Sequence, residues 1–280
     1  MRRLCVIGDP IEHSKSPVIQ NAMLRAAGLE GEYTACRVAG TDTARWLEQA
    51  KGEGYDGFNA TMPHKQALVK LVDALSDDAA KIGAVNTVCI REGKAYGFNT
   101  DGEGFLRALL EAGMDPAGKT VLVLGAGGAA KAVVYALLKA GAKKVAVANR
   151  TVDNAQRLCV QLGMPGAVAC GFSRENLCRQ AENSQLVVNC TSLGMTGTGQ
   201  DFADLSFLDA LSPDAGVFDL IYSPVRTQLL KRAEDLGLNA ANGLGMLVWQ
   251  AVLALEQFTQ TKLDGAAMAA AARSALEESL

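Results

Sequence analysis

The sequence predicts an α/β protein with two domains. Short apolar runs typical of strands alternate with amphipathic, helix-like segments along the whole chain. The length of 280 residues is enough to bury two separate cores. A strand followed by a glycine-rich turn begins only at residue 121, so other elements must occupy the first hundred residues. These three observations define the predicted fold class.

The amino-terminal part is expected to form a domain with a mainly parallel sheet. Apolar runs bounded by turn residues predict its strands, and Pro17 and Pro63 are typical of the first turn of a helix, with Ser16 as an N-cap. The expected elements are a strand at 4–7, a helix after Pro17, a strand at 33–38, a helix at 43–51, a strand at 57–60, a helix after Pro63 that runs to Leu75, and a hairpin of 84–90 against 94–98.

A second domain is expected to follow a helix over 102–111 that ends at Gly113 and crosses between the domains. Strands at 121–124, 145–149, 186–189 and 217–220 are predicted for its sheet. After residue 239 the pattern changes to long helices, the last over 265–280, which would return to the first domain. The predicted domains are therefore 1–104 with 240–280, a substrate-binding domain, and 105–239, a Rossmann-type domain.

The turn after residue 124 has the spacing of a dinucleotide site. Gly125, Gly127 and Ala130 fit the G-x-G-x-x-G/A pattern, in which glycines let a pyrophosphate approach backbone N–H groups at a helix N-terminus. The following apolar residues recur at helical spacing up to Gly141. The expected cofactor contacts at this turn are Gly125, Ala126, Gly127, Gly128 and Ala129.

The second strand of this domain ends in Asn149, Arg150 and Thr151, where NAD enzymes usually place an acidic residue. An acid repels a 2'-phosphate, whereas a guanidinium attracts it. The predicted cofactor is therefore NADP(H); the alternative is that Arg150 is only a solvated loop charge. Asn189, Thr191, Asp219 and Tyr222 follow the carboxyl ends of two further strands, where open parallel sheets bind ligands.

Composition excludes several classes of protein. The formal net charge of -3 indicates no basic surface for nucleic acid. No apolar stretch approaches the length of a membrane span, and the apolar run after Arg3 is too short for a signal peptide. The seven cysteines form no C-x-x-C pair, so neither a metal site nor a disulfide framework is expected and the cytoplasm is the predicted compartment.

The first domain contains polar residues suited to a small polar substrate. Ser14 and Ser16 follow the first strand, and both hydroxyls can face one ligand. Lys65 is expected in the first turn of the helix after Pro63, where a cation opposes the helix dipole; such a local conflict indicates a functional residue. Asp101 begins the helix that crosses between domains, although N-capping alone would explain it. A Lys and an Asp that converge beside a nicotinamide suit carbonyl reduction, with an acid that protonates the alkoxide.

Taken together, these residues resemble the shikimate dehydrogenase family over essentially the whole length of the chain. The resemblance depends on nine motifs in order, which are IGDPIEHSKSP at 7–17, NATMPHK at 59–65, GAVNT at 83–87, GFNTDG at 97–102, the glycine turn, NRT at 149–151, NCT at 189–191, DLIY at 219–222, and NGLGML at 242–247 with Gln250. Each motif alone is modest evidence, and together they are specific.

The resemblance implies an enzyme that reduces 3-dehydroshikimate to shikimate with NADPH, a step toward chorismate and the aromatic amino acids. It implies that Lys65 and Asp101 are the catalytic pair. The implied substrate contacts are Ser14, Ser16, Asn59, Thr61, Lys65, Asn86, Asp101, Tyr222 and Gln250. The implied cofactor contacts, besides the glycine turn, are Asn149, Arg150, Thr151, Thr191, Leu220, Gly243 and Met246.

Two alternatives remain open at the level of sequence. A quinate or aminoshikimate dehydrogenase shares the scaffold, and a nicotinamide-nucleotide-binding regulator could keep the fold without turnover. A second basic residue often follows the NRT triplet in the family, but this chain has Asn154 there, with Arg157 one turn later. The small-molecule substrate is the expected partner, and both a monomer and a homodimer are compatible with the sequence.

Overall fold

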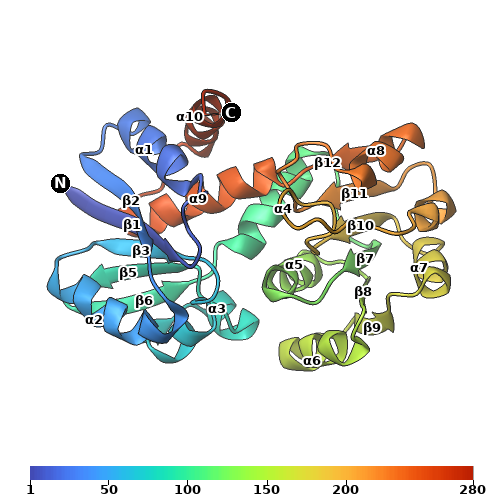
Figure 1. The fold of residues 1–280 in the computed structure, drawn as a ribbon, viewed down its shortest axis with the longest axis horizontal. Coiled ribbons are helices and arrows are strands. Elements are labelled where there is room, and N and C mark those ends of the chain that lie inside the picture. Colours follow the sequence, from blue (N-terminus) through green and yellow to red (C-terminus); the bar gives the residue numbers. More distant parts are fainter. Residues whose placement is uncertain (280) are drawn as a thin grey trace. The chain divides into compact units, whose positions relative to one another are not determined.

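The computed structural model describes residues 1–279, and the chain divides into two compact units. The first unit contains residues 1–104 and 248–280, and the second contains residues 105–247. Two long helices, α4 (Asp101–Glu111) and α9 (Leu244–Thr259), include the two points where the chain passes from one unit to the other. The sequence-based division placed the second of these points after residue 239. Each unit contains one six-stranded sheet (Figure 1).

The sheet of the first unit is mixed, with the strand order β2-β1-β3-β5-β6-β4. Strand β1 is parallel to β2 and β3, whereas β5 is antiparallel to both β3 and β6. The predicted hairpin is confirmed, and Glu92 (φ 50°) and Gly93 (φ 75°) give its turn the left-handed backbone of a two-residue loop. The strands are β1 (Arg2–Gly8), β2 (Gly31–Arg37), β3 (Gly57–Ala60), β4 (Ala74–Leu75), β5 (Thr87–Arg91) and β6 (Lys94–Phe98).

Helices of the first unit come from both ends of the chain. Helix α10 packs along α1, so the last segment of the chain lies beside the first helix (Figure 1). The predicted last helix is confirmed up to Glu277, and Leu280, where the prediction ended, lies outside the described residues. The helices are α1 (Ser16–Ala26), α2 (Thr43–Gly52), α3 (Asp77–Ile82), the start of α4, most of α9 and α10 (Gly265–Glu277).

Two predictions in this unit are wrong. No α-helix follows Pro63: residues 62–66 form turns, Ala67–Lys70 form a short 3-10 helix, and β4 pairs with β6. The apolar spacing that resembles a helix instead reflects burial of single residues such as Leu68 under the sheet. Helix α1 begins at Ser16 itself, with Lys15 in the N-cap position and no side-chain cap.

The sheet of the second unit is entirely parallel, with the strand order β12-β11-β10-β7-β8-β9. This is the order of a doubly wound Rossmann sheet, with its switch point between β7 and β10. The strands are β7 (Thr120–Leu124), β8 (Lys144–Asn149), β9 (Ala167–Gly171), β10 (Leu186–Asn189), β11 (Gly216–Asp219) and β12 (Asn239–Ala241). The helices are most of α4, α5 (Gly128–Lys139), α6 (Val152–Leu162), α7 (Arg174–Ala181), α8 (Gln228–Asp235) and the start of α9.

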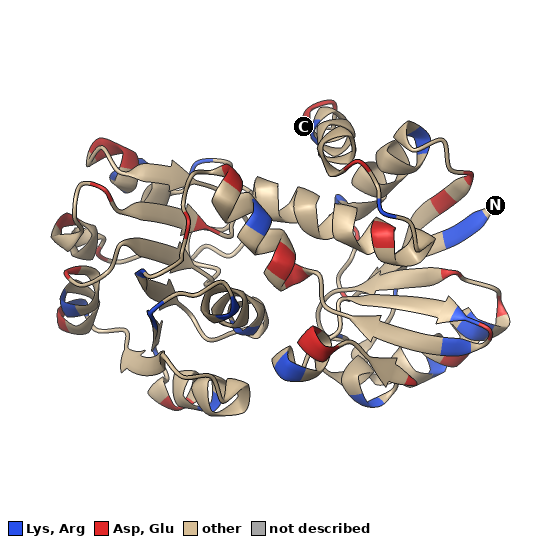
Figure 2. Cartoon of the chain, turned by 180° about the vertical axis from the view of Figure 1, so that it is seen from behind, with Lys and Arg blue, Asp and Glu red and all other residues tan. Residues whose placement is uncertain are grey.

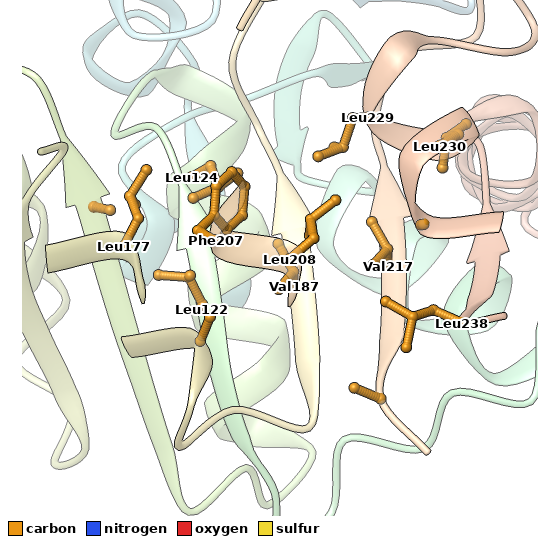
Figure 3. Close-up of a cluster of buried hydrophobic side chains, with 14 of the residues drawn as sticks. Leu122, Leu124, Leu177, Val187, Phe207, Leu208, Val217, Leu229, Leu230 and Leu238 are labelled. Carbon is orange, nitrogen blue, oxygen red and sulfur yellow. The ribbon is translucent and has the colours of Figure 1, made fainter. Parts of the chain in front are cut away.

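A continuous apolar core holds this sheet together. Leu122, Val187 and Val217 on adjacent strands pack against Leu177 of α7 and Leu230 of α8 (Figure 3). All these side chains are buried, which explains why the strands are apolar runs without alternation. Charged residues lie outside this core, and Lys and Arg residues are interspersed with Asp and Glu residues in both units (Figure 2).

Candidate active site

The predicted pairing of Lys65 with Asp101 is present in the first unit. Lys65 Nζ lies 2.7 Å from Asp101 Oδ2, and the two side chains are 28% and 11% exposed. Asp101 is the first residue of α4, where the positive end of the helix dipole stabilises a carboxylate. Because the pair is largely shielded from water, its interaction is screened less than that of a surface ion pair.

The second carboxylate oxygen of Asp101 is also occupied. Asn86 Nδ2 donates to Asp101 Oδ1 at 2.8 Å and to Thr100 Oγ1 at 2.9 Å. Asn86 Oδ1 accepts hydrogen bonds from Thr100 N and Thr87 Oγ1, each at 2.9 Å. The amide of Asn86 is therefore saturated within the protein, and it holds Asp101 in one orientation.

The loop that carries Lys65 is fixed by backbone and buried contacts rather than by a helix. Val85 N donates to Lys65 O at 2.9 Å, and the fully buried ring of the preceding residue, His64, contacts Val38 O at 2.9 Å and Thr43 Oγ1 at 2.7 Å. Burial lowers the pKa of the His64 imidazole, so the ring is neutral at neutral pH. The expected helix-dipole effect on Lys65 is thus replaced by a direct ion pair.

Further polar residues surround the carboxyl ends of β1 and β3. The loops after these parallel strands are joined by hydrogen bonds from Thr61 N to Ile7 O (3.0 Å) and from Asp9 N to Met62 O (3.1 Å). Ser14 and Thr61 are half-buried on these loops, as are Ser16 at the first position of α1 and Gln250 on α9. Ser14 Oγ accepts a weak hydrogen bond from Ser16 N at 3.3 Å. The structure thus brings the predicted hydroxyls of the first unit to two adjacent loops.

Asn59 is in a different situation from these hydroxyls, because it is buried and fully hydrogen-bonded. Its Nδ2 donates to Asn86 O at 3.0 Å and to Thr87 Oγ1 at 2.9 Å, and its Oδ1 accepts from Tyr33 Oη at 2.6 Å. Neither amide hydrogen remains for a ligand. Tyr33 and Thr87 were not singled out from the sequence, since an aromatic and a Thr in strands are typical of an ordinary core.

In the second unit, the glycine turn has the form expected of a phosphate cradle. Gly125 has a φ of +99°, and an added Cβ would lie 2.9 Å from Thr191 Cγ2. Gly127 and Gly128, at the N-terminus of α5, are exposed, and an added Cβ on either would meet no atom within 4 Å. Gly125 is therefore required by the fold, whereas Gly127 and Gly128 leave open space at the start of α5, where the first backbone N–H groups of a helix have no partner within the helix.

The end of β8 also remains open. Arg150 is exposed and makes no ion pair or side-chain hydrogen bond within residues 1–279. Asn149 Nδ2 donates to Thr151 O at 2.8 Å, which shapes the turn into α6. Arg157, the other basic residue near this turn, donates to Asn154 Oδ1. Asn154 stands at the position where the family often has a cation.

The other strand ends of this unit differ from one another. Asn189 and Asp219 are completely buried and bonded to each other at 2.9 Å, so the expectation that they face a ligand is wrong. Burial raises the pKa of Asp219, although hydrogen bonds from Thr227, Ile221 N and Asn189 lower it in part.

The remaining candidate residues of this unit lie in different surroundings. Gly243 is buried against Leu220, and an added Cβ would lie 2.0 Å from Leu220 O. Met246 is half-buried and Tyr222 is 37% exposed.

Comparisons with known families match the chain in three consecutive parts. They are the shikimate dehydrogenase substrate binding domain over residues 6–88, shikimate / quinate 5-dehydrogenase over 109–195, and the shikimate 5'-dehydrogenase C-terminal domain over 243–273. A shikimate dehydrogenase (NADP(+)) from Geobacter sp. (strain M21) is 44% identical over 262 residues, which cover 91% of this chain and 88% of that protein.

Solved structures are similar over the same length. Shikimate 5-dehydrogenase from Thermus thermophilus, in complex with NADP(H) and shikimate, has a TM-score of 0.85 at 36% identity and covers 98% of this chain and 100% of its own. Quinate dehydrogenase from Corynebacterium glutamicum, in complex with NAD, has a TM-score of 0.86 at 33% identity. The match covers 98% of this chain and 99% of that chain. The similarity therefore includes both units.

Proposed function

The chain belongs to the shikimate dehydrogenase family, and we propose that it reduces 3-dehydroshikimate to shikimate with NADPH, with Lys65 and Asp101 as the acid-base pair. It is an oxidoreductase of the shikimate pathway. The observation that carries the catalytic assignment is the distance of 2.7 Å between Lys65 Nζ and Asp101 Oδ2, in a shielded position and with the carboxylate held by Asn86.

The second unit fits a dinucleotide. The open space at Gly127 and Gly128 admits a pyrophosphate, and Ala126 and Ala129 complete the turn. Arg150, which has no acidic partner within residues 1–279, is available for the 2'-phosphate, beside Asn149 and Thr151. Met246 is the proposed contact of the nicotinamide, and Thr191, Leu220 and Gly243 are further proposed cofactor contacts. When bound, NADPH supplies the hydride that reduces the carbonyl carbon.

Residues of the first unit are proposed to donate and accept the proton. As the carbonyl oxygen gains negative charge, the Lys65 ammonium is the group that donates a proton to it, and in the reverse direction the pair accepts the hydroxyl proton of shikimate. Asp101 keeps Lys65 in place and accepts from a substrate hydroxyl. Ser14 and Ser16 are proposed to bind the substrate carboxylate, with Thr61 and Gln250 on its hydroxyls and Tyr222 as a further contact. Asn86, whose amide is already saturated, is proposed to act on the substrate through Asp101. Asn59, which the resemblance implies as a substrate contact, is proposed to support the site indirectly, because its amide donates to Asn86 O and Thr87 Oγ1.

Quinate oxidation is a second candidate activity. One observation favours it, which is the similarity to a quinate dehydrogenase in complex with NAD. Asn154 concerns only the cofactor, since without a second cation there NAD is an alternative to NADP. Assays of the purified protein with 3-dehydroshikimate and NADPH, then NADH, and with quinate and either oxidised cofactor separate the candidates. Turnover on none of these would favour a nucleotide-binding regulator.

Lys65→Ala tests the catalytic assignment directly. We expect kcat to fall by about 100-fold or more, because general acid catalysis contributes at least that much, while the protein folds and binds NADPH. Lys70→Ala is a matched control, since Lys70 is an exposed lysine on the same segment. Near-normal turnover of Lys65→Ala would remove Lys65 from the mechanism.

The compartment and the assembly are also proposals. All seven cysteines are free thiols, which suits the reducing cytoplasm. In the described part of the chain, no helix is both long and apolar enough to span a bilayer. A monomer or a homodimer is proposed for the assembly, and sedimentation at several protein concentrations distinguishes them.

A further inference from the structure

A continuous row of buried hydrogen bonds leads from the edge of the first sheet to the Lys65–Asp101 pair. Tyr33 Oη donates to Asn59 Oδ1 at 2.6 Å, Asn59 Nδ2 donates to Thr87 Oγ1 at 2.9 Å, and Thr87 Oγ1 donates to Asn86 Oδ1 at 2.9 Å. Asn86 then donates to Asp101 Oδ1 at 2.8 Å. Four sequence-distant segments, on β2, β3, β5 and α4, are joined in this way.

The sense of each hydrogen bond in this row is determined by the backbone. Asn86 O can only accept, so Asn59 must direct its NH₂ group toward Asn86 O and its oxygen toward Tyr33. Thr100 N can only donate, so Asn86 must direct its oxygen toward Thr100 and its NH₂ group toward Asp101. Tyr33 is therefore the donor at the far end, and burial raises the pKa of its hydroxyl well above the usual value, which keeps that proton in place.

Tyr33 is itself held firmly. It is 1% exposed, and Asn21 of α1 binds its main chain on both sides, with Tyr33 N donating to Asn21 Oδ1 at 2.9 Å and Asn21 Nδ2 donating to Tyr33 O at 2.8 Å. Every polar side chain between Tyr33 and Asp101 is at most 8% exposed. Water cannot readily replace a lost partner at such positions, so a broken bond leaves a neighbour unsatisfied.

We propose that Tyr33 is a positioning residue for the catalytic pair, acting on Asp101 through Asn59, Thr87 and Asn86. This inference rests on the proposed function, in which Asp101 and Lys65 carry out the proton transfer. Loss of the Tyr33 hydroxyl frees Asn59, which loosens Thr87 and Asn86 and widens the range of orientations of Asp101. The geometry of proton transfer is sensitive to such a change. Tyr33 and Thr87 are not among the proposed substrate contacts, and Ser14, Ser16, Thr61 and Gln250 lie outside this row, so substrate affinity should change less than kcat.

The test is a double-mutant cycle on kcat with Tyr33→Phe and Thr87→Val, which each remove one hydroxyl and little volume. We expect Tyr33→Phe to lower kcat about three- to tenfold and Thr87→Val at least as much, with each KM within about twofold of the wild-type value. The double variant should be no slower than Thr87→Val alone, because both substitutions interrupt the same row.

Tyr55→Phe and Thr259→Val are matched controls. Both residues are buried in the first unit. Within residues 1–279, the Thr259 hydroxyl bonds only to nearby residues: it donates to Leu255 O and Glu256 O, and it accepts from Thr261 N. Both controls should keep the wild-type kcat. A lowered melting temperature with unchanged kcat in Tyr33→Phe would mean a merely structural role and overturn the proposal, as would effects that multiply in the double variant. Turnover that survives in Lys65→Ala would instead contradict the proposed function.

Discussion

The two units prepare their candidate sites in opposite ways. In the first unit, the side chains around Asp101 are buried and already bonded to one another, and both carboxylate oxygens have donors. In the second unit, the glycine turn is exposed, an added Cβ would find open space, and Arg150 has no partner within residues 1–279.

The difference corresponds to two physical tasks. A reacting proton requires groups held in one orientation before the substrate arrives, because electrostatic preorganisation is what lowers the barrier. A bound dinucleotide requires access to backbone N–H groups and an available cation, and these can remain solvated until the ligand replaces the water. We therefore expect substitutions in the first site to change kcat and substitutions in the second to change KM for the cofactor.

The largest expected effect is that of Asp101→Asn. An amide cannot hold the Lys65 ammonium by charge, and its NH₂ group would face either Asn86 Nδ2 or Lys65 Nζ, both donors. We expect kcat to fall by about 100-fold or more, with KM for NADPH nearly unchanged, as measured by steady-state kinetics. An effect confined to KM would show that the first site only binds substrate.

Gly127→Val is expected to have the next largest effect, on the opposite parameter. Gly127 is exposed and nothing lies within 4 Å of an added Cβ, so we expect the free protein to accommodate the side chain, whereas it would occupy the proposed space of the pyrophosphate. We expect KM for NADPH to rise about 10- to 100-fold with an unchanged melting temperature. Gly52→Val, at another exposed glycine with open space, is the control and should alter neither KM for NADPH nor the melting temperature. Normal cofactor affinity in Gly127→Val would place the phosphates elsewhere.

Arg150→Ala addresses cofactor choice and should have a smaller effect. Loss of one exposed charge-assisted bond to the 2'-phosphate should raise KM for NADPH about tenfold, with little change for NADH. Arg157→Ala is a useful comparison, because Arg157 is already bonded to Asn154. Equal effects of Arg150→Ala on the two cofactors would mean that Arg150 does not bind the 2'-phosphate.

The smallest effect concerns the pH dependence of stability through His64. Because burial lowers its pKa in the folded state, the unfolded chain binds a proton at higher pH than the folded one does. The free energy of unfolding should therefore decrease as the pH falls from 7 to 5, and this slope should be reduced in His64→Asn by up to about 1.4 kcal/mol per pH unit. Denaturant titrations at several pH values measure it. The exposed His13 provides the control, His13→Asn, and equal slopes in the two variants would contradict the assignment.

The local pattern of the sequence was sufficient wherever one segment determines its own structure. The glycine turn, the hairpin with Glu92 and Gly93, and four strands of the second sheet (β7, β8, β10 and β11) are encoded by neighbouring residues. The two edge strands, β9 and β12, were not predicted. The segment after Pro63 was predicted wrongly because its apolar residues have helical spacing, while pairing of β4 with β6 and burial of His64 impose turns. Asn189 and Asp219 were misjudged because strand-end positions alone do not reveal whether a side chain faces solvent.

By itself, the sequence determined the two α/β parts and the glycine turn, and it singled out Lys65 and Asp101 as candidate catalytic residues, since residue types, spacing and family motifs carry that information. Only the tertiary structure decided that Asn59, Thr87 and Asn86 join Tyr33 to Asp101, and that Lys65 is held by an ion pair instead of a helix end. The physical reason is that a hydrogen bond needs two atoms at about 3 Å, and residues that are far apart in sequence reach that distance only when the strands pair.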